Sequence, residues 1–174
     1  GTTTSTINIG VTPVNDAPVS ADQNLFTQED TAVSGQVLAT DPDGDVLSYS
    51  VTSSANHGNV TLDTATGSFI YTPSSNYNGS DSFTVTVNDG NGGVTTSVIN
   101  IGVTPVNDAP TSGNQNLSTP QNTAINGSIS ASDPDGDTLT YSVTGSASNG
   151  SITLNPATGG FVYTPSTGYT GSDS

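Results

Sequence analysis

The sequence contains no lysine, arginine, cysteine, methionine or tryptophan. Without cationic side chains the chain cannot neutralise phosphates or anionic lipid, so we expect neither nucleic acid nor a charged membrane surface as a partner. The lack of cysteine excludes disulfides, thiolate zinc sites and cysteine nucleophiles. No apolar run approaches the roughly 20 residues of a membrane helix. We therefore expect no membrane insertion, and any export signal should lie outside these residues.

Acidic side chains supply nearly all of the charge. The chain has 174 residues, 15 of them Asp or Glu, and a formal net charge of −15 at pH 7. Only 30% of the residues are hydrophobic, a low content that can accompany disorder. These hydrophobic residues are regularly spaced, however, which favours a folded chain.

The sequence repeats itself with a period of 92 residues. The stretch 7–18 recurs unchanged at 99–110, and 42 of the 69 residues in 14–82 are identical in 106–174, without a gap. Such self-similarity is typical of a tandem array of one module.

This period predicts three parts. Residues 1–13 correspond to the last strand of a preceding repeat, 14–105 form a complete repeat, and 106–174 form a second repeat that stops before its last strands. We interpret the chain as a window from a longer array.

Within each repeat, apolar residues alternate with polar ones, as in β-strands. Turn signals rich in Asp, Asn, Gly and Pro separate these runs every 8–12 residues, and no stretch has a helical apolar period. About seven strands in 92 residues fit an immunoglobulin-like sandwich of roughly 100 residues. The sequence therefore predicts an all-β fold of tandem immunoglobulin-like sandwiches. Tyr77 is either a tyrosine corner or an ordinary core tyrosine.

An up-and-down path of seven strands gathers the acidic residues at the two poles of the module. One pole holds Asp16, Asp41, Asp43, Asp45, Asp63 and Asp89, and the other holds Glu29, Asp30, Asp81 and Asp108. In a tandem array the two kinds of pole meet at each junction, where carboxylates repel one another unless a cation lies between them.

Ca²⁺ is the cation that best fits many oxygen ligands in loops, and Mg²⁺ fits less well because it requires strict octahedral geometry. The alternative is that these Asp residues only form turns, which needs no metal. The loop is not an EF-hand: Val46 replaces the required Gly, and Thr52 replaces the bidentate Glu.

Several motifs together resemble bacterial cadherin-like tandem repeats, the immunoglobulin-like modules of large secreted or surface adhesins, some described as VCBS-type repeats. They are the linker Pro-Val-Asn-Asp-Ala-Pro at 13–18 and 105–110, the Asp-Pro-Asp-Gly-Asp loop at 41–45, and the stretch Asn-Tyr-Asn-Gly-Ser-Asp-Ser-Phe at 76–83. The resemblance covers the whole chain. It implies a cadherin-like sandwich, an extracellular or cell-surface location, and a spacer that calcium stiffens.

The resemblance also implies roles for individual residues. Linker ligands correspond to Asn15, Asp16, Asn107 and Asp108. The Asp-x-Asp pair after each linker corresponds to Asp41, Asp43, Asp133 and Asp135, the late loop at the same pole to Asp89, and the early glutamate to Glu29. The inner junction would then combine Glu29, Asn107, Asp108, Asp133 and Asp135, with Asp81 and Asp137 as additional ligands. Asp45, the counterpart of Asp137 in the first copy, is a candidate ligand at the other pole of that copy.

The chain departs from animal cadherins at several of these positions. Ala109 replaces a second linker Asn, and no segment matches Leu-Asp-Arg-Glu. In the second copy, Gln121 and Asn122 replace Glu29 and Asp30, which predicts weaker calcium binding at the junction beyond it. We expect one or two ions at a junction rather than the three of animal cadherins.

The leading hypothesis is a calcium-rigidified spacer of an extracellular adhesin whose partners are the neighbouring repeats of the same chain. The alternative is a subunit of an extracellular filament, in which residues 1–13 of one chain complete the second repeat of an identical chain by strand donation. We expect no enzymatic activity, because the single histidine, His57, is replaced by Asn149 in the second copy. A carbohydrate-binding module would require an exposed aromatic strip, which the sequence does not show.

Overall fold

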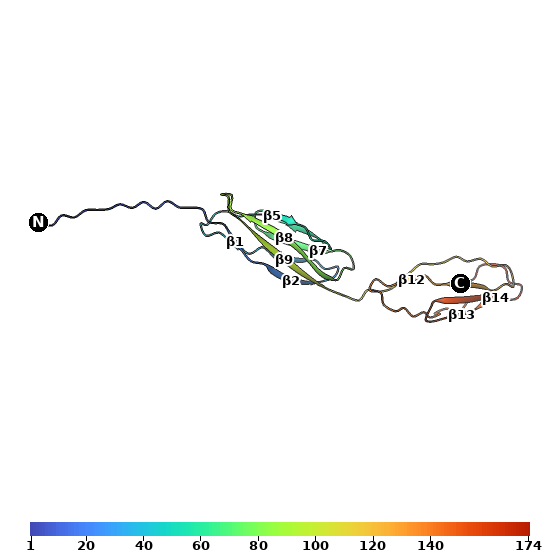
Figure 1. The fold of residues 1–174 in the computed structure, drawn as a ribbon. Helices are drawn as coiled ribbons and strands as arrows, with labels where there is room; N and C mark the ends of the chain where they lie inside the picture. The colour runs from blue at the N-terminus through green and yellow to red at the C-terminus, as the bar shows by residue number, and fades with distance from the viewer. The chain divides into compact units, whose positions relative to one another are not determined.

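A computed structural model describes residues 1–174 and contains only strands and irregular segments (Figure 1). It has no helix that could cross a membrane. The chain divides into two compact units, Gly1–Val106 and Asn107–Ser174. Each unit is a β-structure with its own sheets, so they are described separately.

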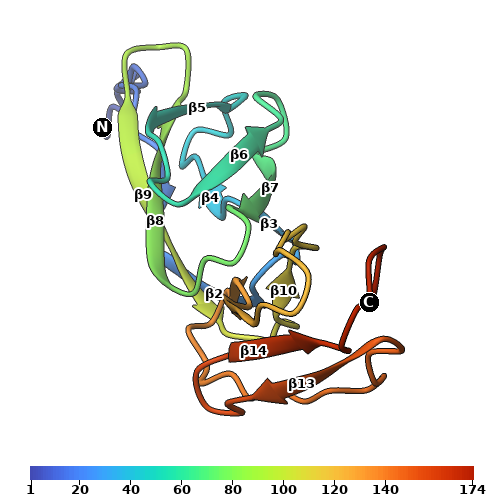
Figure 2. The ribbon, with the colours of Figure 1, turned by 90° about the vertical axis from the view of Figure 1, so that its right-hand side faces the viewer.

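The first unit is a sandwich of two sheets. One sheet has four strands in the order β2-β9-β8-β5, the other has three in the order β3-β7-β6, and β1 pairs with β4. The strands are β1 (Val19–Ser20), β2 (Gln23–Gln28), β3 (Val33–Gln36), β4 (Ala39–Thr40), β5 (Ser48–Ser53), β6 (Gly58–Leu62), β7 (Ser68–Pro73), β8 (Gly79–Asn88) and β9 (Val94–Thr104). Figure 2 shows the two longest strands, β8 and β9, lying antiparallel along the unit.

Nine strand segments appear where the sequence predicts about seven strands. The difference arises because the first two predicted strands each break into two pieces, β1 with β2 and β3 with β4. β1 and β4 pair with each other, whereas β2 and β3 join opposite sheets. The first half of the first strand therefore pairs in a small sheet of its own with β4, and the second half, β2, joins the four-stranded sheet and runs parallel to β9.

The core lies between the two sheets and contains the alternating apolar residues predicted from sequence. Phe69 and Tyr71 come from β7, while Phe83 from β8 and Ile99 from β9 come from the facing sheet; all are buried. The rings of Phe69 and Phe83 meet edge to face at 5.2 Å. This geometry is favourable for aromatic pairs and joins the two layers.

The second unit repeats part of this architecture. β11 (Ile125–Ser128), β14 (Gly160–Pro165) and β13 (Gly150–Leu154) form a three-stranded sheet, and β10 (Thr111–Ser112) pairs with β12 (Ala131–Ser132). The segments 115–120 and 140–145, which correspond to β2 and β5, form no strand. In the first unit those strands pair with β9 and β8. Of these two, the second copy includes within residues 1–174 only the counterpart of the first four residues of β8, at 171–174, and these form no strand.

Residues 1–17 form no strand, although 7–12 have the same sequence as the end of β9. Ile7 and Ile9 are more than four-fifths exposed, whereas their counterparts Ile99 and Ile101 are buried. The backbone N–H and C=O groups of a strand need hydrogen-bond partners on neighbouring strands. Residues 99–104 have such neighbours in β2 and β8, whereas residues 7–12 pair with no strand.

Tyr77 precedes β8 and packs against the edge of the core, and its hydroxyl donates a hydrogen bond to the Ser80 carbonyl oxygen at 2.7 Å. The bond resembles that of a tyrosine corner but reaches a residue downstream rather than upstream.

Candidate metal centre

The Asp41–Asp45 loop folds around its first carboxylate. Asp41 Oδ1 accepts hydrogen bonds from the backbone N–H groups of Asp43 at 2.9 Å and Asp45 at 3.2 Å. Gly44 allows this tight turn because its φ of 81° lies in the left-handed region. One carboxylate oxygen from each of Asp41, Asp43 and Asp45 lies within 4.8 Å of the others. The loop thus concentrates three negative charges.

The linker at 13–18, within the first unit, contacts this acidic loop. The Asp16 N–H donates to Asp43 Oδ2 at 2.7 Å, and the Asn15 side-chain amide donates to Asp89 Oδ2 at 2.7 Å. Asn15, Asp16, Asp43 and Asp89 are therefore gathered at one pole, as the sequence predicts.

Asn91 also belongs to this pole and was not among the residues predicted from sequence. Its side-chain amide donates to Asp45 Oδ2 at 2.8 Å, across the turn that follows β8. The sequence predicts only an ordinary turn for the Asn88–Gly92 stretch, and the tertiary fold places this turn beside the Asp41–Asp45 loop.

Asp89 is the most enclosed carboxylate of the pole, with 4% of its surface exposed. The Asn15 amide lowers the pKa of Asp89, and the backbone N–H groups of Asn91 and Gly93 lower it further, whereas burial opposes them. Hydrogen bonds to the charged form outweigh desolvation, so Asp89 is a carboxylate at neutral pH.

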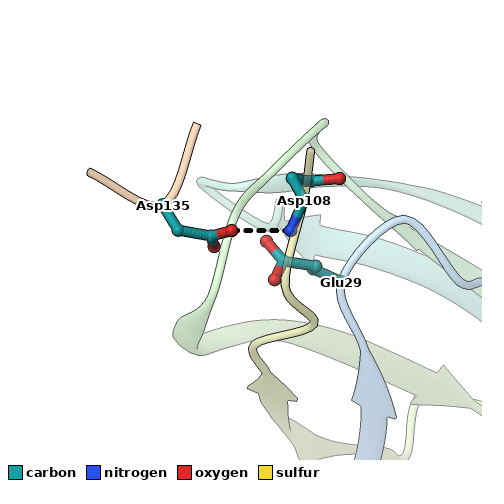
Figure 3. Close-up of side chains that lie close together, drawn as sticks. All are labelled: Glu29, Asp108 and Asp135. Carbon is teal, nitrogen blue, oxygen red and sulfur yellow. Dashed lines mark hydrogen bonds between the residues drawn. The ribbon is translucent and has the colours of Figure 1, made fainter. Parts of the chain in front are cut away.

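The same loop recurs in the second unit. Asp133 Oδ1 accepts the N–H groups of Asp135 at 3.0 Å and Asp137 at 3.2 Å. The Asp108 N–H donates to Asp135 Oδ2 at 2.7 Å (Figure 3), as Asp16 does to Asp43. The Asn107 side-chain amide donates instead to the Asp108 carbonyl at 2.9 Å. The position that corresponds to Asp89 lies beyond residue 174.

Glu29 lies at the opposite pole of the first unit, where β9 ends. Its side chain is 3% exposed, and its Oε1 accepts a hydrogen bond from the Val106 N–H. Its backbone N–H donates to the Thr104 carbonyl at 2.9 Å. Glu29 Oε2 is buried without a hydrogen-bond partner, an arrangement that is costly for a carboxylate.

A family model of the bacterial Ig domain matches residues 15–102 and again 107–174. The chain belongs to the bacterial Ig domain family. The two matches correspond to successive copies of the repeat seen in the sequence. Among curated proteins, none matches the chain.

Cadherin domains are among the solved structures with a similar fold. The EC21-23 fragment of human CDH23 matches with a TM-score of 0.57 and 22% identity, over 87% of this chain and 56% of that one. Human protocadherin-24 EC1-2 matches with a TM-score of 0.52 and 19% identity, over 88% and 80%. The protocadherin GammaB4 extracellular domain matches with a TM-score of 0.52 and 21% identity, over 88% and 30%. These likenesses establish a cadherin-like fold for this bacterial Ig chain.

The chain spans between a quarter and a third of the length of the first four solved structures that it matches.

Asp81 has a different environment from the other predicted ligands of this bacterial Ig chain. Its Oδ1 accepts the N–H groups of Asn56 and Ser82, and its Oδ2 accepts the His57 N–H and the Tyr71 hydroxyl, all at 2.8–3.0 Å. Burial tends to raise the pKa of Asp81, but these hydrogen bonds prevail and lower it. Because all four bonds come from its own unit, we assign Asp81 a structural role in place of the predicted ligand role.

The remaining donors fit a hard divalent cation. They are carboxylate oxygens in loops, which Ca²⁺ favours as ligands. Asp41 Oδ2 is buried without a hydrogen-bond partner, so one oxygen of the loop has unused capacity. No lysine or arginine exists in the chain to neutralise the cluster.

Proposed function

We propose that this chain is a calcium-rigidified structural spacer from an extracellular or cell-surface adhesin. The observation that carries the proposal is the convergence of Asp41, Asp43 and Asp45 oxygens within 4.8 Å in a chain without a basic residue. The recurrence of this loop at 133–137 supports one function for both copies.

Electrostatics supports a bound cation. Two carboxylates about 4 Å apart repel by roughly 1 kcal/mol in water and by roughly 4 kcal/mol at the effective dielectric of a protein surface. Asp41, Asp43 and Asp45 form three such pairs, and Asp89 adds a fourth charge to the same pole. A divalent ion among these oxygens converts the repulsion into attraction, so binding should stabilise the folded unit.

The linker between the units supports a role in stiffening. Glu29 holds the Val106 N–H, and Asp108 follows only two residues later, at most about 7 Å along the chain. We propose that Glu29 from the first unit and Asp108, Asp133 and Asp135 from the second share calcium. An ion bound to both units would restrict their relative motion.

Family membership supports a structural, non-enzymatic repeat outside the cell. Bacterial Ig domains occur here as two copies in one chain, and the fold is that of cadherin domains. The neighbouring repeats of the same chain are the partners that the proposal requires. The adhesin role extends this coarser conclusion and rests on the resemblance of the linkers and loops.

Thermal unfolding with and without calcium tests the proposal. Melts are recorded in chelator, in millimolar Ca²⁺ and in equal Mg²⁺. We expect a calcium-selective rise in Tm, because a ligand at 100 times its Kd stabilises the folded state by about 2.7 kcal/mol. The double variant Asp43→Asn with Asp135→Asn should lose this rise.

Asp63→Asn is the matched control, because it also removes a carboxylate. Asp63 Oδ1 accepts the N–H groups of Ala65 and Thr66, and Asn155 makes the same two bonds in the second copy. The control should keep the full calcium response. A specific calcium site would be refuted if Mg²⁺ raised the Tm as much as Ca²⁺ does. It would also be refuted if Asp63→Asn lost as much of the calcium-dependent rise in Tm as the double variant.

Stiffening is tested by a distance measurement between the units. The chain has no cysteine, so Ser75→Cys and Thr167→Cys, both at exposed positions, allow two spin labels to be placed without background. Calcium should narrow the distribution of label distances, and Glu29→Gln, which copies Gln121 of the second repeat, should prevent the narrowing. An unchanged distribution in calcium would leave the chain as a flexible spacer.

A further inference from the structure

A shallow trough of about 420 Å³ lies on the first unit, and its lining includes none of the residues of the Asp41–Asp45 loop. Its floor comes from outward-facing positions of three adjacent strands, β2, β9 and β8, and the turn before β6 forms one side. The lining residues that matter here are Asn24, Phe26, His57, Ser82, Asn100 and Gly102.

Two rings border the trough in fixed positions. Phe26 is 75% exposed, and its ring lies so close to Gly102 that a Cβ atom there would approach a ring carbon to 2.7 Å. The His57 ring stacks on the Tyr77 ring, with 4.2 Å between centroids and 1° between planes. The Phe26 ring therefore lies over Gly102 and the His57 ring lies over Tyr77, and both remain exposed to solvent.

The second copy of the repeat has neither of these rings. Ser118 replaces Phe26, and Asn149 replaces His57. Among the 69 positions that align between the copies, these are the only two at which one copy has an aromatic or imidazole ring and the other has none. Both positions line the same trough, so the difference between the copies is concentrated at one place.

The chemistry of the lining selects the class of ligand. No cationic lysine or arginine is available to hold an anion, and the net charge of −15 repels one. Asp81, the one carboxylate in the lining, already accepts four hydrogen bonds and cannot serve a cation well. The groups that remain are side-chain amides, hydroxyls and two ring faces, which suit a neutral ligand with both apolar faces and hydroxyl groups.

We propose that this trough binds a neutral saccharide. The apolar face of a pyranose ring would lie against Phe26 or His57, and its hydroxyls would exchange hydrogen bonds with Asn24, Asn100 and Ser82. Asn100 donates to Asn24 Oδ1 at 3.1 Å, so these two amides are already oriented beside each other. The proposal is independent of calcium and gives the first repeat a binding role that the second lacks.

NMR titration of the 174-residue chain with neutral hexasaccharides of glucose, xylose and mannose tests this inference, and uronic-acid hexasaccharides serve as the anionic comparison. We expect saturable shifts at Ser80, Ser82, Asn100 and Gly102 for at least one neutral sugar, and none at Ser172 or Asp173 in the second unit. The proposal would be overturned if, at every concentration, the neutral hexasaccharides caused chemical-shift changes no larger than those caused by the uronic-acid hexasaccharides.

The variant Phe26→Ser with His57→Asn installs the second copy's own residues and should weaken binding at least about tenfold. Phe26→Tyr keeps the ring and should keep binding, which separates loss of the site from loss of folding. Val46→Thr, the matching exchange at an exposed position outside the trough, should change nothing. Unchanged affinity in the double variant, or absence of binding by every neutral sugar at 10 mM, would refute a saccharide site.

Discussion

Replacing Asp81 by Asn should destabilise the first unit strongly. The Asp81 side chain is 7% exposed and accepts hydrogen bonds from three backbone N–H groups and the Tyr71 hydroxyl. Asn keeps the shape but turns one acceptor oxygen into a donor NH₂ group. An NH₂ group at the Oδ1 position would face the Asn56 and Ser82 N–H groups, and at the Oδ2 position it would face the His57 N–H. The Tyr71 hydroxyl can turn to accept from it, so at least one backbone donor loses its acceptor in either orientation.

The size of the effect follows from those bonds. A hydrogen bond to a charged group contributes about 1.5–3 kcal/mol, and a buried donor without an acceptor costs about 1–3 kcal/mol. The contributions of neighbouring bonds do not add fully. We therefore expect a loss of about 3–5 kcal/mol, a large share of the 5–15 kcal/mol that stabilises a typical domain.

The effect should depend on pH with a defined sign. The hydrogen bonds lower the pKa of Asp81 in the folded unit below its unfolded value of about 3.9. The stability that the carboxylate contributes is fully present above the unfolded pKa and is lost as the pH falls through the folded pKa. The difference between the natural chain and Asp81→Asn should therefore be constant near pH 7 and shrink below about pH 4.

Urea unfolding followed by the NMR signals of Val85, Val87 and Ile99 measures the first unit alone, because these core residues belong to it. With an m-value of about 1.5 kcal/mol/M, the expected loss lowers the midpoint by about 2–3 M. Asp173→Asn in the second unit is the matched substitution and should leave these signals unchanged. A loss below about 0.5 kcal/mol at pH 7, or a difference that grows on acidification, would refute the reasoning.

Three further substitutions test the packing of the first unit by the same urea assay. Gly67→Ala should cost more than Gly90→Ala, since both have positive φ but only at Gly67 would the new Cβ meet a ring, that of Tyr49 at 2.9 Å. We expect the free energy of unfolding to fall by about 2 kcal/mol in Gly67→Ala and by about 1 kcal/mol in Gly90→Ala. Equal losses would show that the contact with Tyr49 has no energetic effect. Ser97→Ala removes the 2.7 Å bond to the Ala21 carbonyl and should cost about 1 kcal/mol, whereas a neutral result would mean that water replaces the bond.

The sequence predicted the fold because its periodicity is a direct consequence of strand geometry. Side chains alternate between the two faces of a strand, so the spacing of Phe83, Val85 and Val87 identifies the buried face of β8 without any structure. The break of the first strand into β1 and β2 has no comparable signal. It depends on which sheet each half pairs with, and pairing is decided by residues far away in the sequence.

The acidic pole was predicted in part for a similar reason. The Asp41–Asp45 loop is local, and its short spacing already places the carboxylates together. Asn91 was missed because it reaches Asp45 from a turn 46 residues away. Asp81 looked like another ligand because the sequence showed its charge and not the four donors that surround it.

Sequence by itself determined the alternation, the repeat and the charge of this protein, because these are properties of the order of residues. The tertiary structure decided which of these segments become strands. Residues 7–12 and 99–104 have the same sequence, yet only the second segment forms a strand, because β2 and β8 satisfy its backbone groups and bury Ile99 and Ile101. A β-strand obtains its hydrogen bonds from other segments, so its formation cannot be read from its own residues alone.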